Sequence, residues 1–197
     1  YELLDTGIFN EEKYFDVFTE YAKNDTEDIG IRITIHNRGD QDAYLVLLPT
    51  LWLRNLWTFG LMKQKPLIQL AEGNERYGSV KVTHEQSGDY YFYFERPART
   101  LFTENETNTQ RLYSQPNPGP FVKDAFNNAV IEKNFDWLEE KQEGTKFAPF
   151  YEMNVPAHSS VSIQLRLRRH ELKGDPFGKE FDEVITQRIR EADEFYH

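Results

Sequence analysis

The chain has 197 residues, of which 39% are hydrophobic and 15% aromatic, so it can bury one sizeable core and we expect a single folded domain. Its 33 acidic residues outnumber its 23 basic ones, and the resulting net charge of −10 argues against a nucleic-acid partner. The sequence contains no cysteine, which excludes disulfides, thiolate nucleophiles and cysteine-based zinc sites.

The first part of the sequence contains no recognisable targeting or membrane-spanning segment. It starts at Tyr1 without an initiator methionine and shows no signal peptide. The longest apolar run, 43–53, is interrupted by Pro49 and is shorter than the roughly 20 residues that a membrane span needs. We therefore expect no membrane association, and the lack of cysteine favours a cytoplasmic protein of bacterial type.

Alternating apolar residues then predict antiparallel strands along most of the chain. The clearest is 28–39, in which four isoleucines share one face and polar side chains share the other. Residues 43–53 are apolar on both faces and predict a central strand that is covered on each side. Further strands are predicted at 79–85, 89–95, 99–103, 147–155 and 160–168. Short strands separated by close turns are typical of a mainly β antiparallel sandwich.

The last predicted strand carries the main basic cluster of the chain, and two helical regions flank the final strand pair. The alternation of arginines in QLRLRR predicts that Arg166 and Arg168 face solvent. One or two short helices are expected within 121–138. After Pro176, apolar residues recur at helical spacing to the end of the chain without a capping residue, so the terminal helix is expected to continue in a longer protein.

A search for catalytic motifs finds none. The five histidines are scattered without metal-ligand spacing, and the GxSxG, P-loop and GxGxxG motifs do not occur. We therefore expect no cofactor and no metal. A glycosidase needs two carboxylates about 5–10 Å apart, and no such pair can be singled out among 33 acids.

Two segments supply the candidate site residues. LPTLWLRNLWTFG contains Trp52, Arg54, Asn55 and Trp57, and tryptophan faces beside polar side chains are typical of sugar-binding surfaces, although the tryptophans equally fit a core or a domain interface. LFTENETN is crowded with polar side chains and lacks the glycine or proline of a simple turn. Its candidates for a ligand or domain interface are Glu104, Asn105, Glu106 and Asn108, with a solvated loop as the alternative.

Several motifs in the same order resemble the N-terminal region of bacterial proteins similar to glycoside hydrolase family 63, described as mannosylglycerate-hydrolase-like or glucosidase-like. They are YELLDTGIFNEEKYFDVFTEYAK, IRITIHNRG, LLPTLWLRNLW, LFTENETN, PGPFVKDAFNNAVI and FGKEFDEVITQRIREADEFYH, which together cover essentially the whole chain. The resemblance implies a β-sandwich of the large supersandwich kind in residues 1–175. It also implies that residues 176–197 begin a helical linker to an (α/α)6 catalytic toroid outside this chain.

The resemblance also implies that the general acid and base belong to the toroid. The parent would be an inverting glycosidase acting on a carbohydrate substrate, and this chain alone would be inactive. Three hypotheses then stand: a non-catalytic domain that packs on the toroid and shapes its sugar pocket, a stand-alone carbohydrate-binding module, and a self-sufficient enzyme. The second would use Trp52, Trp57 or the tyrosines Tyr90, Tyr91 and Tyr93. We expect Glu104 to Asn108 to face the toroid near its pocket.

Overall fold

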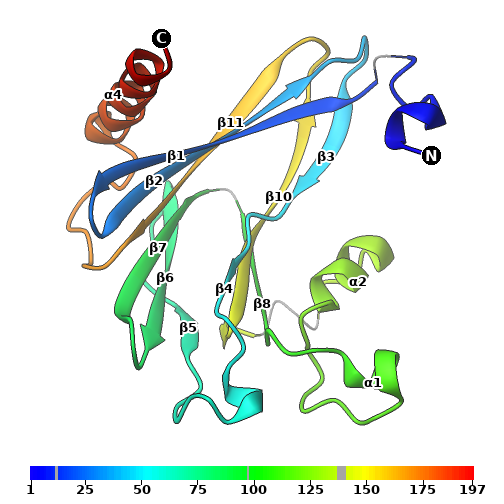
Figure 1. Ribbon diagram of the computed structural model, residues 1–197, viewed down its shortest axis with the longest axis vertical. Coiled ribbons are helices and arrows are strands. Elements are labelled where there is room, and N and C mark those ends of the chain that lie inside the picture. The colour runs from blue at the N-terminus through cyan, green and yellow to red at the C-terminus, as the bar shows by residue number, and fades with distance from the viewer. Residues whose placement is uncertain (12, 97, 137–140) are drawn as a thin grey trace.

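The computed structural model describes residues 1–11, 13–96, 98–136 and 141–197, and it consists mainly of two antiparallel sheets (Figure 1). The larger sheet has the order β1-β2-β11-β7-β6-β5-β9. Its strands are β1 (Phe15–Asp25), β2 (Asp28–Asn37), β5 (Leu67–Leu70), β6 (Tyr77–His84), β7 (Gly88–Glu95), β9 (Glu143–Gly144) and β11 (Ser160–Arg168). The smaller sheet contains β3 (Ala43–Leu47), β4 (Leu51–Trp52), β8 (Arg99–Thr103) and β10 (Lys146–Val155). The predicted mainly β, sandwich-like fold is confirmed.

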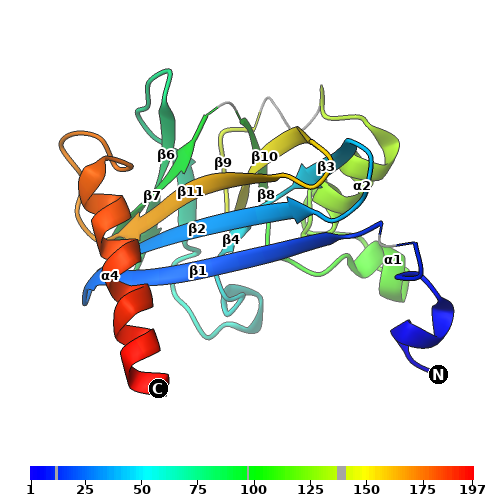
Figure 2. The same cartoon turned by 90° about the horizontal axis from the view of Figure 1, so that it is seen from above.

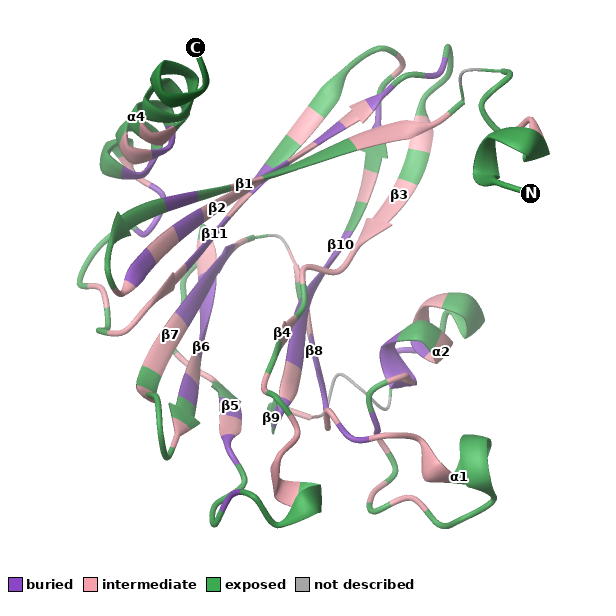
Figure 3. Cartoon of the chain, viewed as in Figure 1, coloured by how far each residue is buried: buried purple, intermediate pink, exposed green. Residues whose placement is uncertain are grey.

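The core fills the space between the two sheets. Phe147 of β10 is fully buried at its centre, where its ring contacts those of Phe92, Phe94 and Phe102. Isoleucines on one face of β2 join the same cluster, as the alternating pattern of 28–39 predicted. Figure 3 shows buried residues concentrated on β7, β8 and β10 and exposed residues toward the C-terminal end of the last helix.

The prediction of a central strand at 43–53 is wrong. This segment forms two short strands, β3 and β4, which pair in turn with the same side of β10, so that Leu47 lies opposite Tyr151 and Leu51 opposite Phe147. Pro49 lies between them and cannot donate a ladder hydrogen bond, which accounts for the interruption. Among the described residues β3 and β4 pair with no second strand, so they form an edge, and Tyr44 and Trp52 are exposed.

The helix α4 (Lys179–Tyr196) lies across the outer face of the larger sheet, over β1 and β2 (Figure 2). Phe181 and Ile185 are buried against the sheet, whereas Ile189 is 40% exposed. The close approach requires a glycine on β2, because a Cβ atom at Gly30 would lie 2.8 Å from the ring of Phe181. The first turns of α4 are thus packed, and the last turns are not.

The prediction that Arg166 faces solvent is wrong, because the start of α4 covers this position of the sheet. Arg166 is buried beneath the start of α4, where its Nε and Nη2 atoms donate to the carboxylate of Asp28 at 2.8 and 2.6 Å. Its Nη1 also donates to the carbonyl of Pro176 at 3.2 Å. The alternation of arginines had placed this side chain on the outer face, but α4 and Asp28 cover that face at this position.

Several elements were not predicted. These are the strands β1, β5 and β9, the short helix α1 (Thr109–Tyr113) and the 3-10 turns η1 (Leu3–Thr6) and η2 (Trp57–Phe59). The helix α2 (Ala125–Glu132) confirms one short helix within 121–138, while positions 137 and 138 lie outside the described residues. Across the described ranges, no helix is long and apolar enough to cross a lipid bilayer.

Candidate functional site

The candidate site lies at one end of the smaller sheet, where the loop after β4 meets the loop after β8. Figure 1 places η2, α1 and the ends of β4 and β8 together at this end of the molecule. Thr103 ends β8, and the polar segment Glu104 to Asn108 follows directly, leading into α1. The predicted polar loop therefore lies beside the segment that contains Trp57.

Glu106 is the centre of the site and is only 5% exposed. Its Oε1 atom accepts hydrogen bonds from Trp57 Nε1 at 2.7 Å and from Lys65 Nζ at 2.9 Å. Its second oxygen, Oε2, has no hydrogen-bond partner among the described residues. The carboxylate is thus charge-balanced by Lys65, while one of its oxygens is left without a donor.

Glu104 extends this arrangement into a network of charged groups. Lys65 Nζ lies 3.0 Å from Glu104 Oε2, which also accepts from the hydroxyl of Thr145 at 2.9 Å. Lys141 Nζ donates to Glu104 Oε1 at 3.0 Å. Burial raises the pKa of Glu104, but hydrogen bonds from Lys141, Lys65 and Thr145 together bring that pKa below its ordinary value. The network therefore holds Glu104 as a carboxylate.

The two asparagines of the segment fix the backbone around this network. Asn105 donates through its side chain to the carbonyl of Leu53 at 2.9 Å, which ties the loop after β8 to the loop after β4. Asn108 caps α1 by accepting from the backbone N–H of Arg111 at 3.0 Å, and its amide donates to Asp124. Local hydrogen bonding thus accounts for both amides.

A cavity of about 550 Å³ opens beside Glu106. Asn55, Asn105 and Thr107 contribute polar groups to its lining, and Lys123 lies at its wall. Two aromatic side chains of the lining, Phe59 and Tyr113, are 74% and 65% exposed. The arrangement combines amides, a hydroxyl, a buried carboxylate and exposed rings, which suits a polar ligand or a docked polypeptide segment.

The structure brings together most of the predicted site residues. Asn55, Trp57, Glu104, Asn105 and Glu106 lie in the network or its cavity, and Asn108 adjoins them as the cap of α1. Within the described ranges, no hydrogen bond joins Trp52 or Arg54 to this network, and both side chains are exposed.

Three participants in the network were not predicted, namely Lys65, Lys141 and Thr145. They lie some 40 positions from the carboxylates they contact, and nothing local in the sequence marks them. The tyrosines considered for sugar binding lie elsewhere, on β7, and Tyr93 is buried with its hydroxyl accepting from Leu172 N–H.

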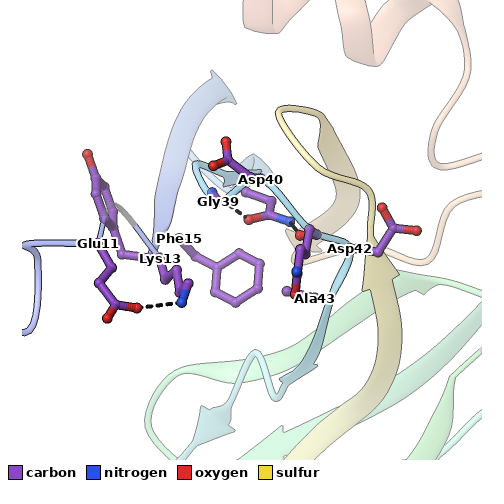
Figure 4. Close-up of a pocket in the computed structure, with 10 residues that line it drawn as sticks. Glu11, Lys13, Phe15, Gly39, Asp40, Asp42 and Ala43 are labelled. Atoms are coloured by element: carbon purple, nitrogen blue, oxygen red, sulfur yellow. Dashed lines mark hydrogen bonds and ion pairs between the residues drawn. The ribbon is translucent and has the colours of Figure 1, made fainter.

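A second cavity, of about 270 Å³, lies between the N-terminal segment and the turn from β2 to β3 (Figure 4). Its surface side chains include Asp40, Asp42 and the ion pair of Glu11 with Lys13. The buried amide of its wall, Asn37, already bonds to backbone groups through both of its polar atoms. The acidic side chains of this cavity are exposed, whereas the larger cavity contains the buried carboxylate of Glu106, so the site beside Glu106 is the stronger candidate.

The ionised state of Glu104 gives a pH prediction. Because the native pKa is lowered, the stability that its pairing contributes is fully present above its ordinary value of about 4.3 and is lost as the pH falls through the native pKa. We expect the free energy of unfolding to fall on acidification below about pH 5, and to fall less in Glu104→Gln. Chemical denaturation at a series of pH values measures this; equal pH slopes in the two proteins would contradict it.

Comparison with known proteins gives one informative match. No family model matches the chain. An uncharacterized protein of Saccharomyces cerevisiae, YMR196W, is 29% identical over 224 aligned positions, which include 93% of this chain and 20% of the yeast protein. The chain therefore spans about a fifth of the length of this relative, and it is similar to one segment of a much longer protein.

Proposed function

We propose that this chain acts as a non-catalytic β-sandwich domain of a protein related to glycoside hydrolase family 63, in which it docks on a helical toroid and shapes the sugar pocket. The sequence motifs support this proposal, and they cover essentially the whole chain. The length of the yeast relative is in keeping with it, since that protein extends far beyond the matched segment.

The observation that carries the proposal is the half-satisfied carboxylate of Glu106. Its second oxygen, Oε2, is not among the fully buried atoms that lack a partner, so it is accessible to a donor from outside the described residues. Within the described chain only Oε1 receives donors. A backbone or side-chain donor of the toroid, or a sugar hydroxyl, would complete Oε2, and the same contact would cover Phe59 and Tyr113.

The state of the two carboxylates argues for a positioning role. A general acid of an inverting glycosidase must carry a proton at the working pH, which requires a raised pKa. Glu104 has a lowered pKa, and Glu106 is balanced by Lys65. In this proposal the proton donor therefore comes from the toroid, and the family resemblance implies the same of the water-activating base.

A stand-alone carbohydrate-binding module is the second candidate. It is favoured by the exposed rings of Trp52 and Phe59, on and just after β4, since exposed aromatic faces can stack on sugars. Calorimetric titration of the 197-residue chain with oligosaccharides distinguishes the two functions, because only this module binds them without a partner domain.

The main test uses the full-length protein that contains this chain. We expect Glu106→Gln to lower kcat/KM on aryl glycosides about tenfold, because the amide removes the charge that orients the neighbouring donors, and Arg54→Ala, on an exposed position nearby, to leave it unchanged. The 197-residue chain alone is expected to show no turnover. Wild-type kcat/KM in Glu106→Gln, or hydrolysis by the chain alone, would refute the proposal.

A further inference from the structure

The free edge of the larger sheet is formed by β1, a long strand with exposed apolar side chains. β1 is 11 residues long and, in the described part of the chain, pairs only with β2. Its side chains Val17, Phe18 and Tyr21 are 50%, 52% and 69% exposed, and its middle contains neither proline nor lysine. Sheet edges are usually protected by short strands, prolines, charges or bulges. β1 has a bulge near Lys23, and its acidic side chains Asp16 and Glu20 are paired with Arg38 and Arg32, but the strand is long and its apolar side chains stay exposed.

The hydrogen-bond pattern shows which backbone groups face outward. The carbonyl of Tyr14 accepts from the N–H of Arg38, so even-numbered residues direct their backbone groups toward β2. Asn37 lies opposite the odd-numbered Phe15, and its N–H points away from β1 and donates to the carbonyl of Ser159 beside β11. Before the bulge near Lys23, odd-numbered residues of β1 therefore make no ladder hydrogen bonds with β2. The odd-numbered residues of β1 therefore present their N–H and C=O groups to the free edge.

We propose that a second copy of this chain pairs with this edge, β1 against β1, antiparallel, about a two-fold axis through Thr19. An axis through Glu20 would place the two Glu20 side chains opposite each other. An axis through Phe18 would set Asp16 against Glu20 and Lys13 against Lys23. Like charges directly opposite destabilise a strand pair, so both neighbouring registers are disfavoured.

The register through Thr19 has complementary pairs instead. Val17 of one copy lies opposite Tyr21 of the other on the inner face, and both side chains are exposed in the single chain. β-branched and aromatic residues form favourable cross-strand pairs. Lys13 comes opposite the acidic end of the second β1, near Asp25. Each pair of odd-numbered residues would exchange two backbone hydrogen bonds.

Helix α4 gives independent support. Figure 2 shows that its C-terminal half projects past the free edge of β1. Its exposed apolar side chains there include Ile189, Phe195 and Tyr196. The helix packs on the face of β1 that carries Ala22, and Phe18 lies on the same face beside His36. In the dimer the projecting turns would cover the exposed Phe18 of the second copy.

Cysteine cross-linking tests the register, since the chain has no cysteine of its own. Thr19→Cys is expected to form a covalent dimer on mild oxidation, because hydrogen-bonded partners in an antiparallel pair have Cα atoms about 5.5 Å apart, within disulfide range. Val17→Cys and Tyr21→Cys are each expected to stay monomeric under denaturing electrophoresis and to cross-link when mixed. Cross-linking of either variant with itself as efficiently as Thr19→Cys overturns this register.

Sedimentation equilibrium tests the dimer itself. Tyr21→Lys places a charge on the edge and is expected to raise the dimer dissociation constant at least about tenfold. Tyr44→Lys is the matched control, since Tyr44 is an exposed tyrosine on an edge strand of the other sheet, and it is expected to dimerise like the wild type. A wild-type chain that sediments as a monomer, or equal effects of the two lysines, refutes the proposal.

Discussion

Replacing Arg166 by alanine is expected to lower the free energy of unfolding by about 3–5 kcal/mol, because the change leaves a buried carboxylate without its counter-charge. Arg166 and Asp28 are only 4% and 2% exposed, and two hydrogen bonds join them. Burial raises the pKa of Asp28, but the hydrogen bonds from Arg166 and Asn24 bring that pKa below its ordinary value. Urea denaturation followed by circular dichroism measures the loss.

Two controls distinguish the effect of an unpaired buried charge from the effects of altered packing and of losing any ion pair. The double substitution Asp28→Leu with Arg166→Met removes both charges and is expected to be far less destabilising than Arg166→Ala, because apolar residues of similar volume can replace a buried ion pair. Arg38→Ala removes the exposed pair with Asp16 and should cost less than about 1 kcal/mol. A small effect of Arg166→Ala, equal to that of Arg38→Ala, would show that α4 does not seal this pair from water.

Phe147→Ala is expected to destabilise the fold by a similar amount, about 3–5 kcal/mol, through a cavity at the centre of the core. Phe147 is fully buried, and its ring centroid lies 4.9 Å from that of Phe102 and 5.4 Å from that of Phe94. These neighbours belong to both sheets, so the loss should lower the unfolding midpoint of the whole domain. Thermal and urea unfolding measure it, with Phe59→Ala, an exposed aromatic, expected to change stability by less than about 0.5 kcal/mol.

The sequence predicted strands well where one face is buried and the other is not. Ile33 and Ile35 of β2 are buried, so their alternation is visible in the sequence. β1 carries exposed residues on both faces and gives no such alternation, and β9 is only two residues long. Arg166 shows where the alternating pattern misleads. The pattern places this side chain on the outer face, but it does not reveal whether the guanidinium contacts water or a buried carboxylate such as that of Asp28.

The candidate site was predictable in its local parts and hidden in its distant ones. The crowding of polar residues at 104–108 indicated one loop of the site, and Trp57 indicated the second segment, which follows β4. The charge that balances both carboxylates comes from Lys65 and Lys141, which lie in other loops. Such pairings depend on which loops meet at one end of the sandwich, and this follows from the tertiary fold alone.

The position of β11 in the larger sheet has a consequence for how the protein folds. β1 with β2, and β6 with β7, are hairpins of neighbouring segments that can form early, whereas β11 is the last strand in the chain and lies between β2 and β7. Contacts between distant segments form slowly because the intervening chain must first be ordered. During synthesis on the ribosome, the two hairpins would therefore stay separate until residues 160–168 have been made. Pairing of these residues with β2 and β7 would then join the hairpins into one continuous sheet.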